Sequence, residues 1–268
     1  MKKILFILSI CTIVCTSCWK TGSYVNNAQS IFESWRVATQ SVLKQNVHMA
    51  FIANAWINGD DSVKRAIEDQ YFPTLRLRHD GDNEYGLYRG PQLLMLFNTG
   101  GKAIDEPGAD WLITQHSIDG IYNPQPAYFN VPGHPRLNIR NLGGNEWSVV
   151  LDSLTCEGSS SDWLISVPGT ATPIDLFATP FTLSGSGAFF YEGSNLYNGS
   201  YDPIPITMRY NFRTPMRQKV GSFVNFDNGK VDIVVSKEAY DDLILSAEVD
   251  EKGKWDIHYR GTTTSIIP

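Results

Sequence analysis

The feature that most constrains the fold is a series of short segments after Pro73 in which apolar and polar residues alternate between turn-forming residues. Alternation places every second side chain on one face of a strand, and turns at intervals of roughly 8–12 residues are typical of antiparallel hairpins. The predicted strands are 74–78, 85–89, 93–97, 110–115, 137–140, 147–151, 163–167, 204–212, 222–226, 231–235, 243–249 and 255–259. We therefore expect a mainly β protein, either a hairpin-rich antiparallel sandwich or a barrel-like meander.

Two glycine-containing motifs are predicted to be turns. Asp227-Asn228-Gly229 separates two strand segments, and glycine accepts the positive φ that tight hairpin turns require. Ser184-Gly185-Ser186-Gly187 precedes the aromatic segment Phe189-Phe190-Tyr191 and is expected to be a flexible turn, because it lacks the pattern of a serine-hydrolase elbow.

Two helices are predicted before the strands. Apolar or small residues recur at spacings of three and four from Ala28 to Trp56, with Gln45 as the one polar break, and this spacing indicates a helix. Asn58-Gly59 is a helix stop in which glycine can adopt positive φ.

The second helix is expected to be shorter. Asp60 or Asp61 can cap its first turn, and it extends to about Tyr71 before Pro73 ends it. The two helices form the segment that precedes the β domain.

Composition excludes several classes of protein. With 42% hydrophobic residues in 268, the chain has enough apolar material for a core, which excludes a disordered protein. Its one long apolar run lies at the start, which excludes a polytopic membrane protein. The formal charge of −6 argues against a nucleic-acid partner, because phosphate contact requires a basic face.

The first 18 residues form a targeting signal. Lys2 and Lys3 precede the apolar run Ile4–Val14, which is too short to span a bilayer, and Cys15-Thr16-Ser17-Cys18 follows. This segment resembles the lipobox of bacterial lipoproteins, in the looser form found in Bacteroidota. The resemblance implies cleavage between Ser17 and Cys18 and a diacylglycerol on Cys18. The alternative is an ordinary secretory signal with incidental cysteines.

The lipobox defines the organisation of the chain and its location. After cleavage Cys156 is the only free thiol, so no disulfide can form within the chain. No acidic residue follows Cys18 directly, and by resemblance to exported lipoproteins this favours the periplasmic face of the outer membrane over the cell surface. The expected segments are a signal peptide (1–17), a lipidated tether (18–25), helices (26–72) and an antiparallel β domain (73–268), with 26–268 as one folding unit.

The sequence contains no recognisable catalytic or metal-binding motif. The histidines are not spaced as metal ligands and are interpreted as surface and turn residues: His48, His79, His116, His134 and His258. Asp80-Gly81-Asp82-Asn83-Glu84 resembles the start of a calcium loop but lacks its later ligands, so a turn is expected. We predict no cofactor, no catalytic residue and no metal ligand.

Aromatic side chains alternate with small polar residues between Phe189 and Tyr201. Sugars stack on aromatic faces, so Phe190, Tyr191, Tyr197 and Tyr201 are candidate ligand-binding residues. The alternative is a pair of strands with inward-facing aromatic rings.

Two serines are candidate modification sites. Asp61-Ser62-Val63 and Asp152-Ser153-Leu154 resemble the O-glycosylation triplet of exported Bacteroidota proteins, which implies glycans on Ser62 and Ser153.

These observations favour a lipid-anchored cell-envelope protein with a non-catalytic binding or accessory role at the outer membrane, toward a glycan or an outer-membrane protein. Two alternatives remain open. One is a hydrolase of envelope polymers or polysaccharides, and the other is an assembly subunit held through its N-terminal helices.

Overall fold

The computed structural model describes residues 28–116, 135–154, 158–169, 172–194, 203–218, 220, 226–237 and 242–267, except for the side chains of 191–194, 203–205 and 237. Cys18 and Ser17 lie outside the described residues.

One antiparallel sheet contains thirteen strands, each paired with its neighbours in the sequence. The strands are β1 (Arg76–Gly81), β2 (Glu84–Arg89), β3 (Gln92–Asn98), β4 (Asp110–Gln115), β5 (Arg136–Gly143), β6 (Glu146–Leu151), β7 (Ser160–Ser166), β8 (Thr182–Ser194), β9 (Pro203–Gln218), β10 (Phe226–Lys237), β11 (Leu243–Val249), β12 (Trp255–Tyr259) and β13 (Thr262–Ile266). The sheet is not closed, because β1 and β13 remain its two edges. The prediction of a mainly β, antiparallel protein is confirmed.

The two predicted glycine-containing turns are wrong. Asp227-Asn228-Gly229 lies inside β10, where the register with β9 shifts and Gly229 has φ of +137°. Ser184-Gly185-Ser186-Gly187 lies inside β8. At both places the strand pairing is irregular. Glycine is suited to such an irregularity for the same reason that it is suited to a turn, because it accepts positive φ.

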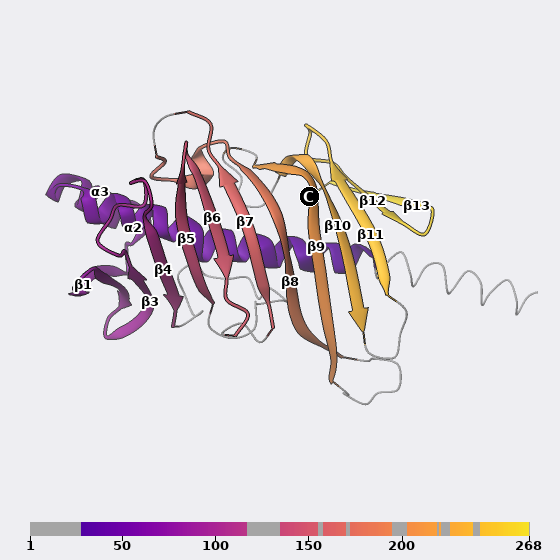
Figure 1. The fold of residues 1–268 in the computed structure, drawn as a ribbon, viewed down its shortest axis with the longest axis horizontal. Helices are drawn as coiled ribbons and strands as arrows, with labels where there is room; N and C mark the ends of the chain where they lie inside the picture. Colours follow the sequence, from indigo (N-terminus) through magenta and orange to yellow (C-terminus); the bar gives the residue numbers. More distant parts are fainter. Residues whose placement is uncertain are drawn as a thin grey trace, which may run out of the picture.

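A long helix runs across the strands along one face of the sheet (Figure 1). Residues 28–42 are α-helical, the π-helix η1 (Leu43–Val47) follows, and α2 (His48–Asn58) completes the helix. The polar break predicted at Gln45 falls inside the π turn. A π turn adds a residue to the helical repeat and so rotates the buried stripe. Beyond it every residue from His48 to Asn54 is buried.

The helix ends as predicted, but not by the predicted geometry. Gly59 has φ of −80°, so its conformation does not require glycine. Its lack of a side chain does matter, because a Cβ atom there would meet Val63 Cγ1 at 2.6 Å and the Ala55 carbonyl oxygen at 2.8 Å. The second helix, α3 (Asp61–Tyr71), begins at the Asp60 cap, whose carboxylate accepts the N–H groups of Ser62 and Val63.

The core lies between the long helix and the face of the sheet that the helix covers. Trp35 on the helix packs edge-on against Tyr210, Phe212 and Trp255, at ring-centroid distances of 6.0, 6.0 and 6.3 Å. Phe51, beyond the π turn, packs on Trp147 at 5.1 Å. The helix therefore covers one face of the sheet, and no described helix covers the opposite face, here called the outer face.

A search of the described helices finds none with the length and apolar character needed to cross a membrane.

Candidate functional site

The pairing between β8 and β9 is irregular near the middle of the outer face, where residues 184–185 of β8 lie opposite the longer segment 212–215 of β9. The register between β8 and β9 shifts between Leu183 and Ser186, and Gly185 at this point has φ of +111°. A side chain on Gly185 would also collide with the backbone oxygen of Asp162 on the neighbouring strand. Bulges of this kind bend a strand and redirect its side chains, and they occur often beside functional sites.

A buried polar pair lies under the next glycine. The Trp163 indole Nε1 donates a hydrogen bond to the Tyr210 hydroxyl at 2.9 Å inside the core. A Cβ atom on Gly187 would clash with that hydroxyl and would lie 2.7 Å from the Ser160 carbonyl oxygen. Burial raises the pKa of Tyr210, so its hydroxyl stays protonated. The two glycines thus let β8 pack closely on β7 and β9.

Three polar side chains line up across this region. Asp162 on β7 pairs in register with Ser186 on β8, and Ser186 pairs with Asn211 on β9. All three are exposed on the outer face. Directly paired residues have Cβ atoms about 5 Å apart, so a carboxylate, a hydroxyl and an amide form one short row, here called the outer triplet. Among the described residues, no hydrogen bond or ion pair engages these three side chains.

The neighbours of the outer triplet close the row at both ends. On the β6 side, Val150 pairs with Asp162 and is 40% exposed. On the β10 side, Asp232 pairs with Asn211 and forms an ion pair with Arg213. The row therefore begins at the apolar side chain of Val150, continues through the three polar side chains of the outer triplet, and ends at the ion pair between Asp232 and Arg213.

His258 lies too far from Ser186 to act as its catalytic base. His258 lies in the same cross-strand row on β12, four strands from Ser186, or about 19 Å at the usual strand spacing. Its Nδ1 atom lies 2.9 Å from the Thr263 hydroxyl on β13. Since a serine nucleophile needs a base within hydrogen-bond reach, His258 cannot activate Ser186. Chemically, the carboxylate, hydroxyl and amide of the outer triplet are groups that can exchange hydrogen bonds with hydroxyl or amide groups.

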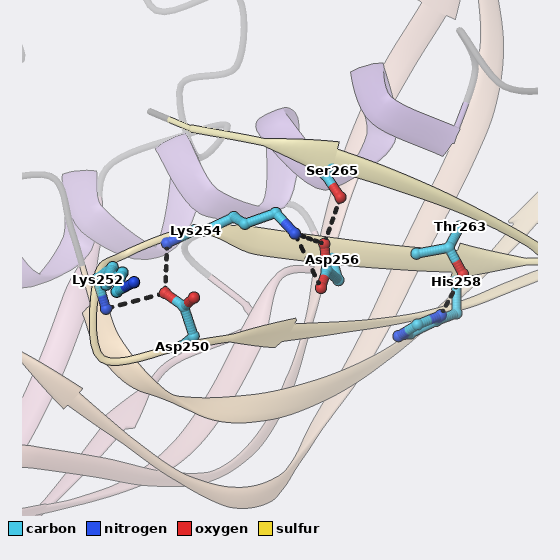
Figure 2. Close-up of polar contacts among 7 residues, drawn as sticks. All are labelled: Asp250, Lys252, Lys254, Asp256, His258, Thr263 and Ser265. Atoms are coloured by element: carbon cyan, nitrogen blue, oxygen red, sulfur yellow. Dashed lines mark hydrogen bonds and ion pairs between the residues drawn. The ribbon is translucent and has the colours of Figure 1, made fainter.

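A second polar network covers the turn between β11 and β12 (Figure 2). The Asp250 carboxylate accepts the N–H groups of Lys252 and Lys254, each at 2.9 Å. Asp256 accepts a hydrogen bond from Ser265 at 2.5 Å and pairs with the Lys254 ammonium at 3.0 Å. These contacts, chiefly the one from Ser265, lower the pKa of Asp256. These contacts join the turn to β12 and β13, so the network holds the hairpin together.

A buried titratable cluster joins the elements outside the sheet. The imidazole of His48 is fully buried on α2, with Nδ1 3.7 Å from Asp175 Oδ1. Asp175 caps the 3₁₀ helix η2 (Leu176–Ala178) and accepts a hydrogen bond from the Tyr71 hydroxyl at 3.1 Å. The interpretation of His48 as a surface or turn residue is therefore wrong.

Burial sets the protonation of this cluster. It lowers the pKa of His48 to about 4, an effect that the nearby Lys44 reinforces and the Asp175 carboxylate opposes. Burial and the same carboxylate raise the pKa of Tyr71 to about 12. At neutral pH the imidazole and the phenol are both uncharged, so the cluster links α2, α3 and η2 without an ion pair.

The candidate aromatic residues are only partly described. Phe190 is half-buried in β8, and its N–H donates to the Ser159 hydroxyl at 2.9 Å. Its neighbour Phe189 is buried and stacks on Tyr210 at 5.1 Å. Tyr191 lies in β8, but its side chain is outside the described part, as are Tyr197 and Tyr201. The aromatic site stays a prediction.

Both candidate glycosylation serines are exposed. Ser62 lies in the first turn of α3, and its hydroxyl donates to Asp60 at 2.9 Å. Ser153 lies in the turn after β6, where its carbonyl oxygen accepts the Gly158 N–H. Modification of either residue stays a prediction.

Sequence reasoning missed the outer triplet. The alternation of serine and glycine from Ser184 to Gly187 was the available signal, because a strand places such serines on one face.

No group of three or more His, Cys, Asp or Glu side chains within the described ranges is arranged to hold a metal ion. Comparison of the chain with known protein families, curated proteins and solved structures finds no match.

Proposed function

We propose that this chain is a lipid-anchored cell-envelope protein with a non-catalytic binding role at the outer membrane, and that it binds a glycan on the outer face of its sheet. The observation that carries the binding role is the outer triplet of Asp162, Ser186 and Asn211, three aligned and exposed hydrogen-bonding groups. Carboxylate, hydroxyl and amide groups complement the hydroxyls of a sugar.

Two features of the fold support the outer face as the binding surface. The long helix buries its side chains against one face of the sheet, and among the described residues no helix covers the outer face. The strands β7, β8 and β9 also pair side by side through the outer triplet, so an extended chain can lie across them. We regard the sheet as an open, barrel-like meander, because its thirteen strands form one sheet around one helix.

The anchor rests on the lipobox resemblance at Cys18, and we place the protein on the periplasmic face. Metabolic labelling with a fatty acid should mark the wild-type chain and not C18A. Protease added to intact cells should leave the protein undigested. Digestion would place it on the cell surface.

A binding experiment tests the ligand class. The full chain, purified in mild detergent, is titrated with a panel of neutral and acidic oligosaccharides. We expect D162A and N211A to weaken binding about tenfold each, because one hydrogen bond to a charged or amide group contributes roughly 1–3 kcal/mol. The matched control is S246A, in the same row two strands beyond Asn211. Equal binding by D162A, N211A and S246A would place the ligand elsewhere.

A further inference from the structure

The two edges of the sheet differ in how they are protected. At β1, Arg76 and Arg78 are exposed, the Arg78 guanidinium lies 4.9 Å from the centre of the Tyr88 ring, and the pairing with β2 is irregular after His79. Charged side chains and irregular pairing are the usual means by which an edge strand avoids pairing with another chain. The β1 edge is therefore protected.

The β13 edge lacks these protections. Its sequence is Thr262-Thr263-Thr264-Ser265-Ile266, without charge, proline or glycine, and it pairs with β12 in continuous register. Thr262, Thr263 and Ser265 are exposed. Among the described strands none pairs with the other side of β13, so its free backbone N–H and C=O groups can pair with an added strand.

We propose that β13 pairs with β13 of a second copy of this chain, antiparallel and around a two-fold axis near Thr264. In that register Thr262 faces Ile266, and Thr263 faces Ser265. Cross-strand pairs of β-branched and hydroxyl side chains stabilise antiparallel strands, and no charge opposes a like charge. Ile267, which is 81% exposed directly after β13, gains a contact near Gly261 of the other copy.

The position of the long helix is compatible with this pairing. Ile266 on β13 pairs with Trp255 on β12, and the Trp255 ring lies 4.7 Å from Phe32 in the first turns of the helix. A two-fold axis perpendicular to the joined sheet leaves both helices on the same side. In each copy the first turns of the helix therefore lie close to the interface. Two anchored copies can then share one membrane. The pairing itself does not depend on the anchor.

Two variants that differ only at residue 263 test the register. T263K/S265K places lysine opposite lysine in the joined strands, whereas T263E/S265K places glutamate opposite lysine. Within each copy, residue 265 lies beside Asp256 and residue 263 beside His258, so neither variant introduces a like-charge carboxylate contact. Both substituted residues are exposed, and T263E/S265K is the folding control for T263K/S265K.

The mass of the full chain in mild detergent is measured by sedimentation equilibrium over a range of concentrations. We expect the wild type and T263E/S265K to dimerise, and T263K/S265K to dimerise at least tenfold more weakly. A monomeric wild type, or T263K/S265K that dimerises like the wild type, would refute the edge pairing. Loss of dimerisation in both variants would refute the register. Because glycan binding is measured separately on the outer face, failure here leaves the proposed function intact.

Discussion

Acidification should destabilise the protein through His48 over a defined pH range. The imidazole is fully buried, and its pKa falls from 6.5 to about 4 on folding. Three groups from separate elements face it: Lys44 one turn earlier on the helix, Asp175 before η2 and Tyr71 at the end of α3. Because the folded state holds the neutral imidazole, the unfolded chain binds a proton that the folded chain does not. Stability is therefore complete above about pH 6.5 and is lost as the pH falls toward 4.

The magnitude follows from the two pKa values. Lowering the pH from 7.5 to 5 should reduce the free energy of unfolding by about 2 kcal/mol, and the loss should reach about 3 kcal/mol at pH 4. Asp60 and Asp256, whose carboxyl pKa values lie below the ordinary 3.8, lose their stabilising contacts only at lower pH. These two carboxyl groups therefore do not cause the loss between pH 7.5 and 5.

Urea unfolding of the wild type, H48Q and H258Q at both pH values measures this effect. H48Q can be less stable than the wild type at pH 7.5, but it should lack the further loss of about 2 kcal/mol at pH 5. H258Q, which removes an exposed imidazole, is the control and should show the wild-type loss. If the wild type and H48Q lose the same free energy between pH 7.5 and 5, the buried neutral imidazole is refuted.

Three further variants test the core and the bulge. The wild type should lose stability between pH 10 and pH 12, because the folded chain keeps the Tyr71 phenol protonated up to about pH 12 whereas the unfolded chain releases the proton near pH 10. Y71F should lack this loss. Equal alkaline unfolding of Y71F and the wild type would contradict it. Y210F should cost roughly 1–3 kcal/mol in thermal or urea unfolding, because it leaves the Trp163 N–H buried without its acceptor. G187A should also cost roughly 1–3 kcal/mol through the clash with Tyr210, and an unchanged melting temperature would mean that β8 and β9 do not pack as closely as described.

The strands and helices follow mostly from local patterns in the sequence. Alternation gives the bounds of β4 and β11, because every second side chain of each strand is buried. The Asp60 cap and the end of α3 before Pro73 follow from local chemistry in the same way. Local patterns could not show that all strands join in one open sheet, because alternation within a strand does not specify whether the first and last strands pair.

The failures occur where long-range packing overrides a local rule. The π turn around Gln45 rotates the buried stripe, and His48 directly after it is drawn into the core although a histidine is most often exposed. Neither the π turn nor the approach of Asp175, which lies more than a hundred residues later in the chain, has a local signal. The buried cluster could therefore be found only from the structure.

The outer triplet shows the same principle at the candidate site. Ser184-Gly185-Ser186-Gly187 has the composition of a turn, yet it forms part of a strand because Trp163 and Tyr210 meet directly beneath Gly187. The two glycines allow β8 to lie close to its neighbours, and this brings Ser186 level with Asp162 and Asn211. If the two glycines only allow close packing, G187A should reduce stability, and the folded G187A protein should bind glycan with the wild-type affinity. If they position the triplet, as we propose, the folded G187A protein should bind glycan as weakly as D162A.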